Sequence, residues 1–344
     1  MNKRVDRLRA ALEEPLLVSN ALNLRYLVGF ESSNAALLVE PERLRLFSDF
    51  RYAEAGRAVD GVEFTETKRS LFADLAERLS GRIGFEADDL SYSRYATLAA
   101  VGIELVPRYG LVEALRLVKD DQEQEAIRQA AAVTTEAFGR LAGEPFVGRT
   151  ERDVAWRVAQ LFHELGGEPA FPTIVAAGPN GARPHAQPGE RMIESGQTVV
   201  IDAAAKLDGY CSDCTRTFAT GSLPERLQEA YSACLEAQLA GVEAVRAGVT
   251  GIDADAAARA RIQSAGFGEW FGHGLGHGVG LDIHEAPRLS RESRDTLAAG
   301  NVVTIEPGIY LEGLGGIRIE DLAIVRDDRP ELLTGFTREL VTVD

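Results

Sequence analysis

Two acidic residues directly follow apolar, strand-like runs, and they constrain the folds open to this sequence more than any other feature does. Asp202 follows Val-Val-Ile at positions 199–201, and Glu306 follows Val-Val-Thr-Ile at positions 302–305. A carboxylate carried into an apolar interior without a partner is costly. Both positions therefore require a nearby positive group, and a bound cation is one such group.

The segment 199–213 is expected to form two antiparallel strands joined by a tight turn at Asp208 and Gly209. In such a hairpin Asp202 and Asp213 point to the same face. They would lie directly opposite or one diagonal apart, at about 4.5 to 8 Å. Because two like charges at that distance repel, this hairpin also favours a cation.

A second hairpin is expected around Gly313, because Glu306 and Glu320 are equally far from it in the sequence. This register places Glu306 and Glu320 across from each other. Pro307 has no amide hydrogen for a ladder, so it must lie at a bulge or an edge.

His277 lies in the run GHGLGHGVG (272–280), where alternate glycines let the backbone approach a ligand closely. Neutral imidazole is the commonest metal ligand. Together with four carboxylates and no thiolate, it favours Mn²⁺, Co²⁺, Fe²⁺ or Zn²⁺ over Ca²⁺ or a structural zinc bound by cysteines. The sequence thus predicts a two-metal hydrolase site made by Asp202, Asp213, His277, Glu306 and Glu320.

One competing motif is the C-x-x-C formed by Cys211 and Cys214. In a strand these two side chains point to opposite faces, and no second C-x-x-C occurs. The remaining cysteine, Cys234, lies in a helix-like stretch. We expect reduced thiols, which are typical of a cytoplasmic protein.

Several runs, in this order, resemble the Xaa-Pro peptidases, namely aminopeptidase P and prolidase: SDCTRT (212–217), HGLGHGVGLDIHEAPR (273–288), TIEPGIY (304–310) and GIRIED (316–321). These enzymes are metallopeptidases with the "pita-bread" fold. The resemblance implies a fold that combines α/β and α+β parts. Residues 1–118 would form a small N-terminal α/β domain, and residues 119–344 a C-terminal pita-bread domain of the creatinase/aminopeptidase type.

Within the first 118 residues, short apolar runs alternate with helix-like segments. Strands are expected near 15–19, 35–39, 44–48, 83–86 and 103–106, and helices near 51–59 and 71–79. A long helix is expected from Asp120 to about Leu141. Further helices are expected near 150–165, 224–247 and 253–266, with glycine-rich loops at 178–181 and 313–316.

The resemblance also implies a role for each candidate ligand. Asp202 and Asp213 would bind one ion, with Asp213 bridging to a second ion that His277 and Glu306 complete, and Glu320 would bridge as well. In two-metal hydrolases the shared water ionises near neutral pH and attacks the carbonyl group. Glu306 would take the proton of this water and pass it to the leaving nitrogen.

The resemblance also implies roles for residues around the ligands. His284 matches a histidine that steadies the tetrahedral intermediate, and His185 matches one that flanks the substrate. Arg318 shares the strand face of Glu320 and is expected to orient the bridging carboxylates. His273 is expected either to line the substrate pocket or to support the backbone. His163 lies in an amphipathic helix outside these motifs, where a surface or core role is expected.

The chain departs from the family at the first ligand, where Asp-Ala-Ala-Ala (202–205) replaces the usual Asp-Phe-Gly-Ala or Asp-Leu-Gly-Ala. This change leaves ligation intact and alters the expected shape of the nearby pocket. The sequence does not separate a dipeptidase from an aminopeptidase. A dipeptidase needs a cation for the proline carboxylate, and the candidates are Arg288, Arg318 or an arginine such as Arg45 or Arg51 from a partner subunit.

Other functions of related proteins fit this sequence less well than an Xaa-Pro peptidase does. A methionine aminopeptidase lacks an N-terminal domain of this size, and a creatinase would have lost the ligand set. A non-catalytic binding protein of the same fold would also have lost ligands.

The formal net charge of −16 argues against nucleic acid or anionic membranes as partners. No apolar run is long enough to cross a membrane, and the first residues lack the apolar stretch of a signal peptide. We expect a cytoplasmic enzyme acting on short proline-containing peptides, and the family resemblance suggests a homodimer.

Overall fold

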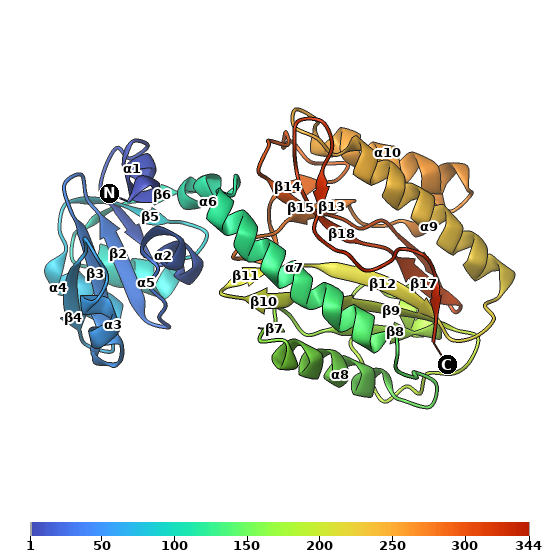
Figure 1. Cartoon of the computed structure of the whole chain (residues 1–344). Coiled ribbons are helices and arrows are strands. Elements are labelled where there is room, and N and C mark those ends of the chain that lie inside the picture. Colours follow the sequence, from blue (N-terminus) through green and yellow to red (C-terminus); the bar gives the residue numbers. More distant parts are fainter. Residues whose placement is uncertain (1, 344) are drawn as a thin grey trace. The chain divides into compact units, whose positions relative to one another are not determined.

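The computed structural model describes residues 2–343. Contacts between residues divide the chain into two compact units, Met1–Arg116 and Leu117–Asp344 (Figure 1). This division lies two residues before the domain boundary expected between residues 118 and 119. Each unit has its own buried apolar cluster, so each is described separately below.

The first unit is built on a mixed six-stranded sheet with the order β4-β3-β2-β1-β5-β6. Its strands are β1 (Leu16–Val18), β2 (Ala35–Val39), β3 (Leu44–Asp49), β4 (Glu63–Thr67), β5 (Arg82–Glu86) and β6 (Glu104–Arg108). Its helices are α1 (Lys3–Arg9), α2 (Ala21–Val28), α3 (Ala53–Arg57), α4 (Leu71–Arg78), α5 (Tyr92–Ala99) and α6 (Leu111–Arg116). The expected α/β character is confirmed. Strand β4 was missed because it is a mostly polar edge strand without a buried apolar face.

The helices of the second unit lie close to the ranges expected from the sequence. They are α7 (Asp121–Leu141), α8 (Glu151–Glu164), α9 (Glu225–Ala244) and α10 (Gly251–Ser264). Helix α7 begins where a capping box forms, since Asp120 accepts from the amide of Glu123 and Glu123 accepts from the amide of Asp120. The sequence Asp-Asp-Gln-Glu thus fixes the start of this helix.

The strands of the second unit form several small sheets. They are β7 (Glu168–Pro169), β8 (Ile174–Ala177), β9 (Thr198–Ala203), β10 (Ala205–Leu207), β11 (Tyr210–Cys211), β12 (Cys214–Ala219), β13 (Gly276–Gly278), β14 (Glu285–Leu289), β15 (Val302–Ile305), β16 (Gly308–Leu311), β17 (Gly315–Arg318), β18 (Asp321–Ile324), β19 (Glu331–Leu332) and β20 (Val341–Thr342). Two sheets dominate, with orders β20-β12-β9-β8 and β14-β13-β15-β18-β19. The hairpin β16-β17, which lies between β15 and β18 in the sequence, forms a two-stranded sheet of its own.

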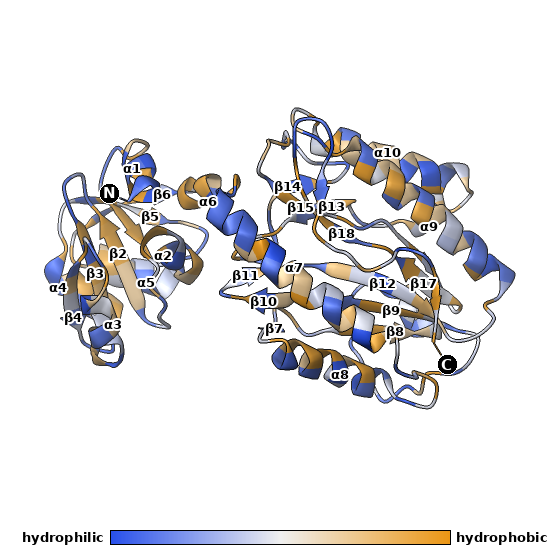
Figure 2. Ribbon diagram, in the orientation of Figure 1, coloured by the Kyte–Doolittle hydropathy of each residue, from blue (hydrophilic) through white to orange (hydrophobic). Residues whose placement is uncertain are grey.

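Each dominant sheet is covered by one helix pair (Figure 1). Residues of α7 and α8, such as Phe138 and Phe162, pack with Val199 of β9 and Phe218 of β12 in one buried cluster. Residues of α9 and α10 pack with β15–β18 in a second cluster. Figure 2 shows hydrophobic residues concentrated in strands such as β9, whereas α8 and α10 alternate between hydrophilic and hydrophobic turns. This arrangement of strands between two helix pairs is the pita-bread fold that the family resemblance implied.

The glycine-rich loop expected at 313–316 is partly wrong, because Gly315 and Gly316 belong to β17. A side chain at Gly316 would meet the carbonyl oxygen of Gly181, and one at Gly181 would meet the amide nitrogen of Gly316. Glycine at 181 and 316 therefore lets these two backbone segments come into contact. Among residues 2–343, no helix is long and apolar enough to cross a membrane.

Candidate metal centre

The first hairpin has the expected turn and face. Asp208 and Gly209 both have positive φ, 48° and 74°, as a tight two-residue turn requires. Strand β9 pairs antiparallel with β12 so that Asp202 lies opposite Thr215. Asp213 is two residues before Thr215, which puts it one diagonal from Asp202 on the same face. Asp213 itself lies in a break between β11 and β12.

The second hairpin keeps the expected register across a break. Gly308 pairs with Arg318, and Ile305 pairs with Asp321, so the partner numbers sum to 626 on both sides. Glu306 and Glu320 lie in the interruption between these ladders, as does Pro307. The amide of Glu320 instead donates to the carbonyl oxygen of Thr215 at 3.1 Å, which joins the two acidic hairpins.

His277 lies in β13, between two glycines that pack closely against the backbone of other segments. A Cβ atom at Gly276 would lie 2.0 Å from the carbonyl oxygen of Thr304, and one at Gly278 would lie 2.2 Å from that of Ala286. The amide of His277 donates to Thr304 Oγ1 at 3.0 Å. Glycine on both sides therefore lets this strand lie close enough for His277 to reach the acidic residues.

The five candidate ligands converge on one cavity of about 430 Å³. Ligand-type atoms of Asp213, His277 and Glu320 all lie within 4.8 Å of one another. His277 Nε2 is 3.3 Å from Glu306 Oε1 and 3.7 Å from Asp213 Oδ2. The Oδ1 atoms of Asp202 and Asp213 are buried without a hydrogen-bond partner among the described residues. Buried carboxylate oxygens without a hydrogen-bond partner are suitable ligands for divalent cations.

The electrostatics of the metal-free cluster reflect this crowding. Burial, reinforced by the charges of Glu320 and Asp202, raises the pKa of Asp213 well above its usual range. Burial and the charge of Glu306 likewise raise the pKa of Glu320. Burial would raise the pKa of Glu306 too, but the hydrogen bond and charge of His277 outweigh it and lower that pKa to about 2. Without metal, burial and mutual repulsion thus favour the protonated forms of Asp213 and Glu320.

Arg318 is buried and makes contacts on several sides. Its Nη2 donates to Asp202 Oδ2 at 2.7 Å, and its Nε donates to Thr215 Oγ1 at 3.0 Å. Thr215 Oγ1 in turn donates to Glu320 Oε2 at 2.7 Å. Arg318 therefore orients two of the candidate ligands, Asp202 directly and Glu320 through Thr215.

Tyr310 and Thr215 are site residues that the sequence reasoning missed. Arg318 Nη1 donates to the Tyr310 hydroxyl oxygen at 2.9 Å, so the hydroxyl can donate to His273 Nε2 at 2.8 Å. Nδ1 of His273 is 2.8 Å from the carbonyl oxygen of Gly274. Both ring nitrogens of His273 thus have protein contacts, although the ring also lines the cavity. The motif EPGIY contains Tyr310, and a Cβ atom at Gly308 would lie 2.4 Å from its hydroxyl.

The remaining histidines differ in whether they line the cavity. His284 lines the cavity with its ring centroid 4.4 Å from that of His277. His185 is exposed and lines the same cavity. His163 is exposed on α8, and the cavity residues do not include it.

Glu151 supports the segment that carries His185, and the sequence reasoning missed it as well. It is fully buried at the start of α8. Its carboxylate accepts from the amides of Ala177 and Gly189 at 2.9 and 3.1 Å and from Asn180 Nδ2 at 2.9 Å. One carboxylate therefore holds both ends of the segment between Ala177 and Gly189.

The four candidate cations for a substrate carboxylate differ in their contacts. Arg45 pairs with Glu40, and Arg51 pairs with the buried Asp49, both within the first unit. Arg318 is engaged as described above. Arg288 is exposed and lines the cavity, and its side chain has no hydrogen bond or ion pair among residues 2–343.

Fold and site together are those of a metallopeptidase. Residues 125–327 match the sequence profile of metallopeptidase family M24, and residues 4–118 match that of the creatinase/prolidase N-terminal domain. The chain belongs to metallopeptidase family M24.

Individual relatives are similar over nearly the whole chain. An Xaa-Pro dipeptidase from Bacillus anthracis superposes with a TM-score of 0.96 at 37% identity, covering 99% of both chains. An X-Pro aminopeptidase from Thermotoga maritima superposes with a TM-score of 0.90 at 32% identity, covering 98% of this chain and all of that one. The Xaa-Pro dipeptidase of Pyrococcus furiosus is 36% identical over 344 residues, which is 92% of this chain and 99% of that protein.

Proposed function

We propose that this protein is a dinuclear-metal peptidase that hydrolyses the Xaa-Pro bond at the N-terminus of short peptides. The observation that carries the proposal is the convergence of five ligand-type side chains on one cavity of about 430 Å³. Relatives described as Xaa-Pro dipeptidases and as an X-Pro aminopeptidase support the choice of substrate. The residues Phe171, Pro172 and Ile174 give the cavity an apolar wall that suits a proline ring.

The proposed ligands are Asp202, Asp213, His277, Glu306 and Glu320, holding two divalent ions. We propose Mn²⁺, with Co²⁺, Zn²⁺ or Fe²⁺ as alternatives that the same ligand set accepts. Bound ions would supply a water of lowered pKa and stabilise negative charge on the carbonyl oxygen.

The side chains around the ligands have their own proposed roles. Glu306 takes the proton of the attacking water and delivers it to the leaving nitrogen. His284 and His185 contact the substrate from the cavity wall, and His273 lines the pocket. Arg318 keeps the ligand carboxylates oriented.

The test is a matched peptide set with purified protein, with and without added Mn²⁺. Ala-Pro, Ala-Pro-Ala and the control Ala-Ala separate the possible activities. Cleavage of Ala-Pro alone indicates a dipeptidase, and cleavage of Ala-Pro-Ala indicates an aminopeptidase. Cleavage of Ala-Ala alone would assign a different metalloaminopeptidase activity to the site. If no peptide is cleaved although metal is bound, the Xaa-Pro proposal is wrong.

Between the two Xaa-Pro activities, the Arg288 side chain, which has no hydrogen bond or ion pair among residues 2–343, favours the dipeptidase. Arg288 lines the cavity, so its guanidinium can pair with the carboxylate of a C-terminal proline. We expect Arg288→Met to raise the KM for Ala-Pro about 10- to 100-fold with little change in kcat, because a hydrogen bond to a charged group is lost from substrate binding. The amide Ala-Pro-NH₂, which lacks the carboxylate, is the control. An equal change for acid and amide would contradict this role.

Metal binding should also change how stability depends on pH. Asp213 and Glu320 have raised pKa values in the folded, metal-free protein, so the stability they contribute is complete below about pH 4 and is lost as the pH rises through those values. The pKa of His277 is raised as well, because the hydrogen bond and charge of Glu306 outweigh its burial, and it acts in the same direction. Bound cations need deprotonated ligands and reverse this trend.

We therefore expect the increase in Tm caused by Mn²⁺ to grow between pH 5 and pH 8. Thermal unfolding of EDTA-treated and Mn²⁺-loaded protein measures it. Glu86 in the first unit, whose pKa burial raises to about 7, affects both samples equally and cancels in the difference. A Tm increase that does not vary with pH would contradict the proposed ligands.

We further propose a cytoplasmic location, a homodimer, and domains at residues 1–118 and 119–344. Three free, buried cysteines support a reducing compartment. Light scattering of the purified protein tests the oligomeric state.

A further inference from the structure

A buried ion pair lies next to Glu320 in the sequence and has no role in the catalysis proposed above. Arg216 Nη2 is 2.8 Å from Asp321 Oδ1, and the two side chains are 2% and 0% exposed. Arg216 follows Thr215 on β12, and Asp321 follows Glu320 at the start of β18. A charge pair this deeply buried persists only when its remaining hydrogen-bonding groups are satisfied.

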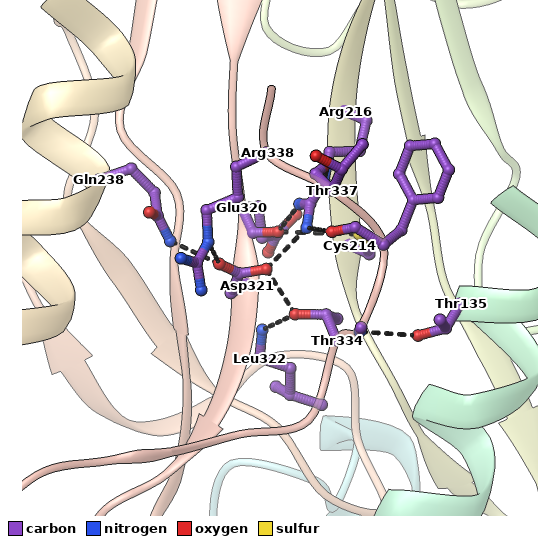
Figure 3. Close-up of polar contacts among 12 residues, drawn as sticks. Thr135, Cys214, Arg216, Gln238, Glu320, Asp321, Leu322, Thr334, Thr337 and Arg338 are labelled. Carbon is purple, nitrogen blue, oxygen red and sulfur yellow. Dashed lines mark hydrogen bonds and ion pairs between the residues drawn. The ribbon is translucent and has the colours of Figure 1, made fainter. Parts of the chain in front are cut away.

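The C-terminal segment, defined as residues 334–338, provides several of the hydrogen bonds to this ion pair (Figure 3). Thr334 Oγ1 donates to Asp321 Oδ1 at 2.6 Å, and Arg338 Nε donates to Asp321 Oδ2. Arg216 donates to the carbonyl oxygens of Phe336 and Thr337 at 2.7 and 2.8 Å. The C-terminal segment thus surrounds the ion pair with both donors and acceptors.

The C-terminal segment is itself anchored in the second unit. The Phe336 ring packs against those of Phe138 and Phe218, at centroid distances of 5.8 and 6.0 Å. The Tyr231 hydroxyl donates to the carbonyl oxygen of Arg338 at 2.7 Å. The amide of Gly335 donates to Thr135 Oγ1 of α7 at 3.0 Å. The contacts with Asp321 are therefore part of a fixed structure.

The ion pair acts directly on Glu320. Arg216 Nη1 donates to the carbonyl oxygen of Glu320 and, at 3.0 Å, to that of Thr215. Gln238 Nε2 completes the shell of Asp321 at 2.7 Å. The guanidinium of Arg216 thereby holds together two backbone positions, that of Glu320 and that of the threonine whose hydroxyl orients the Glu320 carboxylate.

We propose that the C-terminal segment is a positioning element for the metal centre, in which Arg338 and Thr334 hold the Arg216–Asp321 pair and so fix Glu320 in the geometry that binds both ions. This inference rests on the proposed function, since it takes Glu320 as a bridging ligand. Arg338 and Thr334 are positioning residues, because neither contacts the cavity.

The experiment uses the full chain carrying Arg338→Met or Thr334→Val, each of which removes one donor to Asp321. Mn²⁺ affinity of the metal-free proteins is measured by calorimetry well below their Tm, together with unfolding in EDTA. We expect about tenfold weaker Mn²⁺ binding for Arg338→Met, as for loss of an outer hydrogen bond that orients a ligand. Excess Mn²⁺ should restore most of the kcat. Arg338→Lys, which keeps the charge, should recover part of the affinity.

Arg128→Met is the matched control. Arg128 pairs with Glu331 at 2.7 Å in the same unit and has a side chain about as exposed as that of Arg338, but it does not contact Asp321. Because Glu331 is 38% exposed whereas Asp321 is buried, Arg128→Met should lower stability in EDTA less than Arg338→Met does, and it should leave the Mn²⁺ affinity unchanged. Unchanged affinity in both Arg338→Met and Thr334→Val, or an equal loss in Arg128→Met, would overturn the inference and leave the proposed function standing.

Two further results are decisive. If the wild-type protein binds no Mn²⁺ or other divalent ion, the proposed metal centre and this inference both fail. If Arg338→Met does not fold, Thr334→Val decides, because valine keeps the shape of threonine and removes only the hydroxyl that reaches Asp321.

Discussion

Replacing Glu306 by glutamine will lower kcat for Ala-Pro by about 100- to 10,000-fold, the usual effect of removing a general base. The pKa of Glu306, about 2 in the metal-free protein, leaves this carboxylate ionised at neutral pH and able to accept a proton. Glutamine keeps the size of the side chain and can still accept from Thr304 Oγ1, which lies 3.1 Å from Glu306 Oε1. It cannot take a proton from water.

Glu306 is also a proposed ligand, so kcat must be measured together with bound metal. Glu312→Gln is the matched control, because Glu312 is exposed in the turn between β16 and β17 of the same hairpin. If the kcat of Glu306→Gln falls only in proportion to its metal content, Glu306 is a ligand without a role in proton transfer. If more than a tenth of kcat remains with both ions bound, the proposed role is wrong.

The part of the site that could be predicted from the sequence is the part governed by local register. The turn at Asp208 and Gly209 and the symmetry of the chain about Gly313 determine which residues face each other. These rules act over a few residues and do not depend on the rest of the fold. They predict that Asp202 lies near Asp213 and that Glu306 lies across from Glu320.

The contacts that hold these ligands could not be predicted in the same way. Arg318 and Asp202 are 116 residues apart, and Arg216 and Asp321 are 105 apart. No periodicity or spacing rule links such positions, because they meet only when two separate hairpins pack together. Tyr310 shares the β16–β17 hairpin with Arg318, but its contact with His273, 37 residues away, forms only when this hairpin packs against another part of the chain.

Replacing Arg318 by methionine will destabilise the metal-free protein by about 3 to 5 kcal/mol, the cost of leaving a buried charge without its partner. Arg318 is 3% exposed and its Nη2 lies 2.7 Å from Asp202 Oδ2. Methionine fills much of the same volume but leaves Asp202 without that donor. Denaturant unfolding in EDTA measures the loss. Arg128→Met, which breaks the partly exposed pair with Glu331, should cost only about 0 to 1 kcal/mol.

The same variant with bound Mn²⁺ separates two explanations of why Arg318 is buried here. If Asp202 is a metal ligand that Arg318 orients, Arg318→Met also weakens metal binding, and the destabilisation should be clearly larger in the metal-loaded protein than in EDTA. If Arg318 serves only to fill and cross-link the interior, the loss will be equal in both states. An equal loss would therefore remove Asp202 from the ligand set, whereas a larger loss with metal would mean that Arg318 holds this carboxylate in the orientation that binds the ions.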